Sequence, residues 1–124
     1  MIASFCATTR SSSSSKLDWV GWHLERLELR QFFDVVHTGD DVERTKPDPA
    51  LYHLALQSLG LAADQAIVLE DSPNGVTAAQ RAGIFAVAVP NPLTARLDLT
   101  HADLKLNSLA EITLDELLAR AGNR

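Results

Sequence analysis

The sequence is poor in the features that mark secreted, membrane-bound and nucleic-acid-binding proteins. Its single cysteine, Cys6, cannot form an internal disulfide and fits a reducing compartment. No apolar run approaches the ~20 residues that a membrane span requires. The N-terminus also lacks the charged region and long apolar core of a secretory signal. Lysine and arginine number 11 against 16 acidic residues, and the net charge of −5 argues against non-specific nucleic-acid binding. We therefore expect a cytoplasmic protein that binds neither membranes nor nucleic acid.

Length and composition favour one small globular domain. A chain of 124 residues can bury one core but not two. Its contents of 46% hydrophobic and 22% charged residues are ordinary for such a domain. No internal repeat or interdomain linker is evident, so we expect residues 1–124 to form a single unit.

Residues 67–83 carry the most informative local pattern. The short apolar run that begins at Ile67 predicts a buried strand, and Glu70 and Asp71 stand where that strand would end. A polar turn follows, and then a helix of small residues that ends at Gly83, where a left-handed residue is favoured. Ligands of α/β proteins bind beyond the carboxyl ends of parallel strands, so the pattern is typical of an active site.

The two adjacent carboxylates admit two interpretations. Neighbouring negative charges repel, and a hard cation such as Mg²⁺ would neutralise them while sharing phosphate oxygens with a substrate. Alternatively, Glu70 and Asp71 are solvated loop charges, with Asp71 helping to cap the next helix.

A second candidate residue is Lys46. Pro47 disfavours helical backbone at Lys46, while Asp48 and Pro49 supply a helix N-cap and a first helical residue. The lysine is thus presented just ahead of a helix that runs from residue 49 to about residue 59 and ends at Gly60. Taken alone, this pattern starts a helix and leaves the lysine solvated. The expected apolar face of this helix consists of Leu51, Leu54, Ala55 and Leu59.

Further elements are expected on both sides of this region. Residues 84–89 form an apolar run typical of a strand buried on both faces. Asn91 follows in a loop at the carboxyl end, where it either lines a site or, as we expect, serves a plain turn. Toward the N-terminus the pattern predicts a helix over residues 18–29, a strand over residues 32–37 and a solvated acidic pair at residues 40–41. Toward the C-terminus it predicts an edge strand over residues 102–106 and a helix over residues 114–121.

Two of these segments resemble motifs of one enzyme superfamily. LEDSPNGVTAAQRAG, residues 69–83, is similar to the fourth motif of the haloacid dehalogenase superfamily, in its β-phosphoglucomutase-like sugar-phosphatase branch. TKPDP, residues 45–49, resembles the third motif, and Lys46 precedes Glu70 by 24 residues. The resemblance extends from about Ser13 to the C-terminus, while residues 1–12 match poorly. It implies an α/β fold with a Rossmann-like, three-layer α/β/α core and a mostly parallel sheet.

The resemblance also implies roles for the acidic and basic residues. Lys46 would stabilise phosphoryl charge and orient the nucleophile, a task that suits a fixed ammonium. Glu70 and Asp71 would bind Mg²⁺. The implied partner is a small phosphorylated metabolite, with sugar phosphates as the expected class.

Polar residues are the remaining candidates for binding phosphate or substrate. The second motif of the superfamily places a phosphate-binding hydroxyl on Ser13, with Ser12 or Ser14 as alternatives. The serine run could equally be a polar loop with helix-capping capacity. Ser72 and Asn74, in the turn after the acidic pair, are the other candidates.

The first motif of the superfamily has no counterpart in this sequence. That motif, Asp-x-Asp-x-(Thr/Val), ends a central strand and supplies the attacking aspartate and the general acid/base. The sequence contains no Asp-x-Asp, and the helical cap expected between the first and second motifs is also missing. Without the attacking aspartate, transfer through an aspartyl-phosphate cannot occur. The sequence therefore resembles the C-terminal half of such an enzyme, with an incomplete core.

Three functional hypotheses follow. The chain is a Mg²⁺-dependent phosphatase by family, or a phosphomutase of the same branch; a non-catalytic, truncated remnant; or half of a split enzyme whose N-terminal half is a separate chain. Loss of the central strand would leave unpaired sheet edges. Either the strands pair anew, or residues 2–7 replace that strand, or the chain is marginally stable alone. We expect the isolated chain to show no phosphatase turnover.

Overall fold

The computed structural model describes residues 25–26, 37 and 41–123. The predictions for Ser13 and Ser14, for residues 1–12 and for the strand over residues 32–37 lie outside the described residues, apart from His37. Of the helix predicted over residues 18–29, the described pair at positions 25 and 26 is helical. Of the acidic pair predicted to be solvated, Asp41 is described; it is exposed, and its Oδ2 lies 3.6 Å from Nδ1 of His37.

A parallel sheet with the strand order β1-β2-β3 forms the centre of the described region. Its strands are β1 (Ile67–Glu70), β2 (Phe85–Ala88) and β3 (Leu104–Lys105). The register opposes Glu70 to Ala88, so β1 and β2 end at the same edge of the sheet. All three strands lie where the sequence predicted them. Within the described residues, no strand pairs with the second edge of β1.

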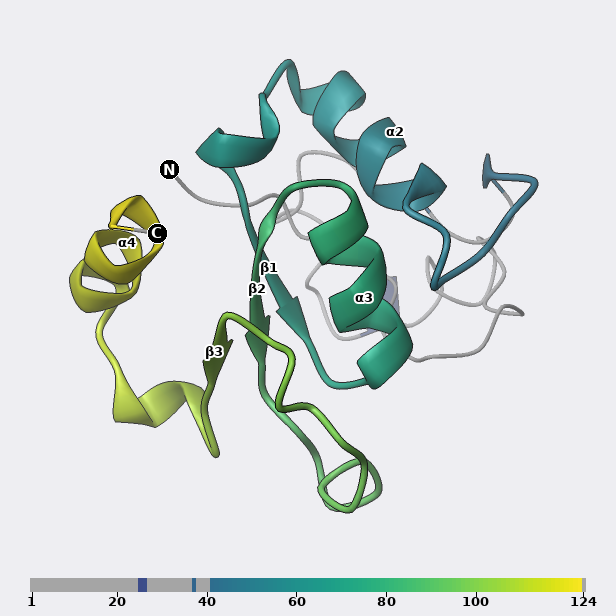
Figure 1. Ribbon diagram of the computed structural model, residues 1–124. Coiled ribbons are helices and arrows are strands. Elements are labelled where there is room, and N and C mark those ends of the chain that lie inside the picture. Colours follow the sequence, from purple (N-terminus) through teal and green to yellow (C-terminus); the bar gives the residue numbers. More distant parts are fainter. Residues whose placement is uncertain (1–24, 27–36, 38–40, 124) are drawn as a thin grey trace.

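Helices cover both faces of this sheet (Figure 1). Helices α2 (Ala50–Leu59) and α3 (Pro73–Arg81) lie on one side, and α4 (Leu114–Gly122) lies on the other. Two short 3-10 helices, η3 (Ala63–Gln65) and η4 (Leu109–Glu111), also lie in the described region. The predicted three-layer α/β fold is confirmed. In the part of the chain that the structure describes, no helix has the length and apolarity needed to cross a membrane.

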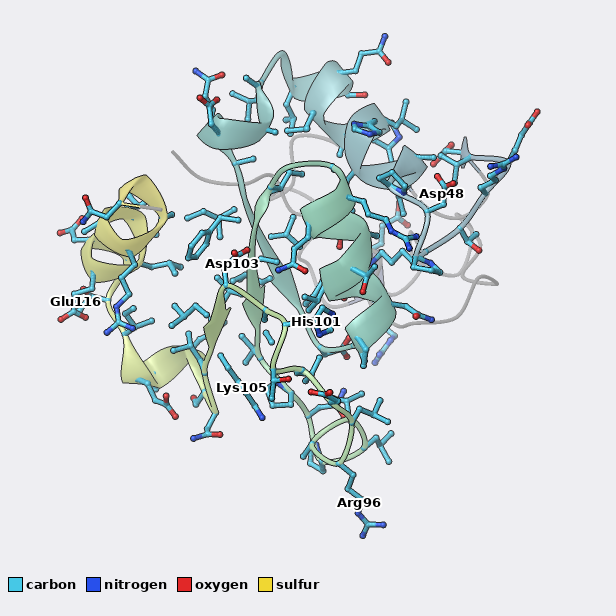
Figure 2. The ribbon with its side chains drawn as sticks, viewed as in Figure 1. Asp48, Arg96, His101, Asp103, Lys105 and Glu116 are labelled. Atoms are coloured by element: carbon cyan, nitrogen blue, oxygen red, sulfur yellow. The ribbon has the colours of Figure 1, made fainter. Side chains whose placement is uncertain are left out.

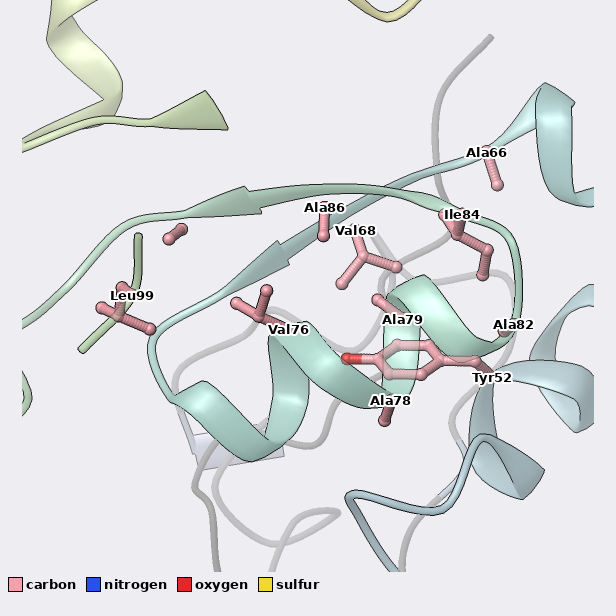
Figure 3. Close-up of a cluster of buried hydrophobic side chains, with 11 residues drawn as sticks. Tyr52, Ala66, Val68, Val76, Ala78, Ala79, Ala82, Ile84, Ala86 and Leu99 are labelled. Carbon is pink, nitrogen blue, oxygen red and sulfur yellow. The ribbon is translucent and has the colours of Figure 1, made fainter. Parts of the chain in front are cut away.

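Small side chains allow α3 to pack closely on the sheet. Ala78 and Ala79 of α3 and Ala86 of β2 are fully buried in one core (Figure 3). Phe85 and Leu117 belong to a second core, between the opposite face of the sheet and α4. Because β2 contributes to both cores, all of its residues are buried, as predicted for a central strand.

The helix ends follow the sequence closely. Gly60 and Gly83 adopt left-handed backbone, with φ of 66° and 79°, which glycine adopts without steric cost. The predicted start of α2 is wrong by one residue, because Pro49 is the N-cap rather than the first helical residue. Asp48 still acts at this end, since its Oδ1 accepts a hydrogen bond of 2.9 Å from the Ala50 N–H.

A capping box begins α4 and offers a test of this part of the fold. Thr113 Oγ1 accepts from the Glu116 N–H at 3.2 Å, and Glu116 Oε2 accepts from the Thr113 N–H at 2.8 Å. The bond from the Thr113 N–H favours the ionised carboxyl and, with a smaller contribution from the Thr113 side chain, lowers the pKa of Glu116. A lowered folded-state pKa stabilises the protein above the unfolded-state pKa, and this contribution is lost as pH falls through the folded-state pKa.

We expect Thr113→Ala to destabilise the protein by about 1 kcal/mol at neutral pH, as is typical for the loss of a helix cap. It should move the pKa of Glu116 only part of the way back toward its ordinary value, because alanine keeps the backbone N–H that is the largest cause of the shift. Carboxyl NMR during a pH titration follows this change. Thr100→Ala, at an exposed loop position, is the control that should leave Glu116 unchanged. A free energy of unfolding of Thr113→Ala equal to that of the wild type would contradict the capping box.

Candidate functional site

Three loops meet at the carboxyl edge of the sheet. The loop before α2 carries Lys46, the end of β1 and the turn after it carry Glu70 and Asp71, and the loop after β2 carries Asn91. The parallel register of β1 and β2 brings the segments that follow these two strands together. A backbone hydrogen bond of 2.7 Å from the Val89 N–H to the Glu70 carbonyl extends the pairing one residue past β2. The predicted active-site edge therefore exists in the described residues.

Lys46 and Glu70 form a buried ion pair. The Lys46 ammonium donates to Glu70 Oε1, and the two side chains are only 8% and 4% exposed. A buried carboxylate is costly unless it is paired, and the ammonium supplies that pairing. The alternative of a solvated lysine is therefore wrong, as is a solvated Glu70.

Tyr52 is part of this arrangement, although sequence reasoning did not identify it. Its hydroxyl donates to the same Glu70 oxygen, and its ring centroid lies 5.1 Å from the Lys46 ammonium nitrogen, within the range of a cation–π contact. The ring is buried among the small side chains of α3 and the sheet (Figure 3). The sequence did hold a signal for Tyr52. It lies three residues before Ala55, and this helical spacing places it beside the predicted apolar face of the helix.

The other Glu70 oxygen lies against the backbone of α3. A Cβ added to Gly75 would stand 2.0 Å from Glu70 Oε2 and 2.1 Å from its Cδ, distances that real atoms never reach. Gly75 itself is fully helical and buried, so the need for glycine here is one of space. The Glu70 carboxylate is thus enclosed by an ammonium, a phenol and a helix backbone.

The loop that carries Lys46 is fixed to its surroundings by hydrogen bonds. The Asp48 N–H donates to the Thr45 carbonyl at 3.0 Å, which closes a turn around Lys46 and the cis peptide bond that joins it to Pro47. Arg81 at the end of α3 donates to the Pro47 carbonyl at 3.2 Å. The loop that carries Lys46 is therefore held by its own turn and by α3.

Asp71 has a different environment from Glu70. It is half-buried, and its Oδ2 accepts a hydrogen bond of 2.9 Å from Asn91 Nδ2. Among the described residues, Asp71 Oδ1 has no hydrogen-bond partner. The alternative in which Asp71 caps the next helix is wrong, because Ser72 is the N-cap of α3 and accepts from the Gly75 N–H at 3.2 Å.

The structure places the remaining described candidates on α3. Ser72 is 2% exposed, and the cap bond occupies its hydroxyl oxygen. Asn74 lies exposed in the first turn of the helix rather than in a turn ahead of it. Binding of phosphate or substrate by Ser72 and Asn74 stays a prediction.

The residues at this edge fit part of a magnesium shell. Asp71 offers a half-buried carboxylate oxygen, which is the ligand type that Mg²⁺ prefers. Glu70 is already paired with Lys46. No group of three or more histidine, cysteine, aspartate or glutamate residues in the described ranges could hold a metal ion alone. Binding of Mg²⁺ by Glu70 and Asp71 therefore stays a prediction, and it requires further ligands.

A parallel α/β core with a buried lysine–glutamate pair and a half-buried aspartate at its carboxyl edge defines the class of protein. The chain belongs to the haloacid dehalogenase-like hydrolase family, whose family model matches residues 11–89. The resemblance found in the motifs is thereby confirmed.

Curated relatives support the same assignment. YhcW of Bacillus subtilis is 45% identical over 107 residues, which cover 86% of this chain and 49% of YhcW. Validoxylamine A 7'-phosphate phosphatase of Streptomyces hygroscopicus is 42% identical over 100 residues, 81% of this chain and 46% of that protein. The chain thus spans about half the length of the curated relatives it matches.

Solved structures agree in fold. The crystal structure of CbbY from Rhodobacter sphaeroides in complex with phosphate matches with a TM-score of 0.64 and 41% identity, over 67% of this chain and 37% of CbbY. The β-phosphoglucomutase of Clostridium difficile matches with a TM-score of 0.71 at 22% identity, over 81% of this chain and 43% of that chain, which shows the shared fold alone.

Proposed function

We propose that this chain supplies the lysine and acidic part of a Mg²⁺-dependent phosphatase site for small phosphorylated metabolites. The observation that carries the proposal is the buried Lys46–Glu70 pair beside the half-buried Asp71. Sugar phosphates are the proposed substrate class. Support for that class comes from relatives such as the phosphorylated carbohydrates phosphatase of Thermotoga maritima, 48% identical over 61 residues, and hexitol phosphatase A of Escherichia coli, 43% identical over 82 residues.

Each residue has a distinct task in this proposal. Glu70 and the ring of Tyr52 hold the Lys46 ammonium in one place, and a fixed cation stabilises developing phosphoryl charge better than a mobile one. Asp71 would give Oδ1 to Mg²⁺. When bound, the ion neutralises phosphate oxygens and orients the substrate. Ser13 or Ser14 would add the phosphate-binding hydroxyl.

A second contributor is needed for turnover. The sequence contains no Asp-x-Asp, so the nucleophile and the general acid/base must come from another polypeptide segment. The proposed partner is an N-terminal half, which would account for the part of the relatives' length that this chain does not cover. The same absence favours one alternative function, a non-catalytic domain that binds Mg²⁺ and phosphate.

Hydrolysis assays with and without an added N-terminal half test the proposal. We expect the pure chain to hydrolyse neither p-nitrophenyl phosphate nor sugar phosphates, in Mg²⁺ or in EDTA. Co-expression with the N-terminal half of YhcW should restore Mg²⁺-dependent hydrolysis. Lys46→Met and Asp71→Asn should each then lower kcat/KM by about 10²-fold or more, the usual loss when an electrostatic stabiliser is removed.

Exposed residues of the same types provide matched controls. Lys105→Met and Asp115→Asn change exposed side chains on β3 and α4 and should leave the reconstituted activity unchanged. Reconstituted activity that is insensitive to both Lys46→Met and Asp71→Asn would contradict the proposed site. Turnover by the pure chain, abolished by Asp71→Asn, would contradict the need for a second contributor. A folded pair of halves with no turnover would favour the binding domain.

A further inference from the structure

Asn91 stands beside Asp71 because of the sheet register and not because of sequence proximity. The two residues are 20 positions apart, and each lies just beyond the carboxyl end of its strand. Their side chains share one hydrogen bond, from Asn91 Nδ2 to Asp71 Oδ2 at 2.9 Å. From the sequence, Asn91 was expected to serve the turn; the structure adds this contact with a proposed metal ligand.

The chemistry of the loop fixes which end of the Asn91 amide faces Asp71. Asn91 Oδ1 accepts from the backbone N–H groups of Leu93 and Thr94, at 2.8 Å and 3.0 Å. The opposite orientation would set the amide oxygen against a carboxylate and the amide nitrogen against two N–H donors, which cannot bond to it. The NH₂ group must therefore point at Asp71.

The loop also restrains Asn91 through its backbone. The Asn91 N–H donates to Thr94 Oγ1 at 3.0 Å, and the Asn91 carbonyl accepts from the Ala95 N–H at 2.9 Å. Leu99, 1% exposed, anchors the far end of the loop in the core, while Arg96 projects outward from it (Figure 2). The Asn91 NH₂ group that donates to Asp71 therefore belongs to a side chain whose orientation the turn fixes.

We infer that Asn91 is a positioning residue for Asp71, holding the carboxylate by Oδ2 so that Oδ1 is presented to a divalent cation. The inference rests on the proposed function, because it assumes that Asp71 binds the metal. Partners that orient a ligating carboxylate commonly change metal affinity by about 10–100-fold when they are removed. Asp71, half-buried at a strand end, depends on this partner because no other described residue bonds its carboxylate.

The substitution Asn91→Ser separates the proposed effect on Asp71 from formation of the turn. The serine hydroxyl can still accept a hydrogen bond from a nearby backbone N–H, as serine does in turns. The variant lacks the NH₂ group that donates to Asp71. We expect Asn91→Ser to weaken Mn²⁺ binding about tenfold, with little change in melting temperature. Because metal binding requires further ligands, the Kd is measured on the chain paired with the co-expressed N-terminal half of YhcW, from the electron paramagnetic resonance signal of free Mn²⁺.

Three further variants complete the experiment. Thr94→Ala removes a turn contact but keeps the amide, so it should lower the melting temperature without changing the Kd for Mn²⁺. Asn107→Ala, at an exposed loop position, should change neither. In an Asp71→Asn background, Asn91→Ser should have no further effect, because its action passes through Asp71.

The outcomes separate this inference from the proposed function. Mn²⁺ binding by the wild-type pair of halves that is lost in Asp71→Asn but equal in Asn91→Ser overturns the positioning role alone. Absence of Mn²⁺ binding by the wild-type pair at millimolar concentrations overturns both the metal site and the positioning role. Weaker binding in Asn91→Ser, with an unchanged melting temperature and no effect in the Asp71→Asn background, supports the inference.

Discussion

Lys46→Met is expected to destabilise the protein by about 3–5 kcal/mol, because it leaves the Glu70 carboxylate buried without its cation. Both side chains are nearly inaccessible, so water cannot replace the lost ammonium without opening the site. The Tyr52 hydroxyl would stay as a neutral donor, but one hydrogen bond does not offset a buried charge. Urea unfolding followed by circular dichroism gives the free energy of unfolding of each variant.

The matched control and a double-mutant cycle isolate the ion pair. Lys105→Met, on the exposed side of β3, should change the free energy of unfolding by less than about 0.5 kcal/mol. Glu70→Gln combined with Lys46→Met removes both charges, so the double variant should be clearly more stable than the sum of the single losses predicts. A Lys46→Met loss similar to that of Lys105→Met would contradict the buried pair.

Gly75→Ala is expected to destabilise the protein by about 2 kcal/mol or more, although alanine is the better helix former. The new methyl group would overlap the Glu70 carboxylate, whose Oε2 lies 2.0 Å from the Cβ position. Glu70 can move only by leaving Lys46 and Tyr52, since both contacts hold its other oxygen. Steric overlap and loss of the ion pair therefore add.

Gly122→Ala in α4 is the control, because nothing lies within 4 Å of its Cβ position. There alanine should be neutral or stabilising by up to about 1 kcal/mol. In a Glu70→Ala background the overlap disappears, so Gly75→Ala should cost little. Thermal and urea unfolding of Gly75→Ala, Gly122→Ala, Glu70→Ala and the Glu70→Ala/Gly75→Ala double variant measure these effects on stability. An equal effect of Gly75→Ala with and without Glu70 would show that the carboxylate does not approach the helix.

Local features of the sequence predicted the elements of the fold. Apolar runs in residues 67–69 and 84–89 specify buried strands, because such runs have no polar face to present to water. Gly60 and Gly83 mark helix ends, because each follows a helix and takes the left-handed conformation there. These signals act within a few residues, so composition and spacing suffice to read them.

The interactions within the site could not be read in this way. Tyr52 and Lys46 reach Glu70 from 18 and 24 residues away, through the packing of α2 and its preceding loop against β1 and α3. The sequence identified Lys46, Glu70 and Asp71 as candidates. It did not show that Glu70 pairs with the lysine while Asp71 accepts a hydrogen bond from an asparagine. Which partner meets which carboxylate depends on strand register and helix position, and neither is a local property.

By itself the sequence determined the α/β class, the positions of the strands and the approximate positions of the α-helices in the described region, the resemblance to the haloacid dehalogenase superfamily and the absence of Asp-x-Asp. Only the tertiary structure decided that Glu70 is buried with Lys46, that Gly75 must lack a side chain, and that Asn91 supports Asp71. The physical reason is that backbone preference and hydrophobic patterning act over short spans of chain. Burial, close approach and hydrogen-bond choice arise when distant segments pack together.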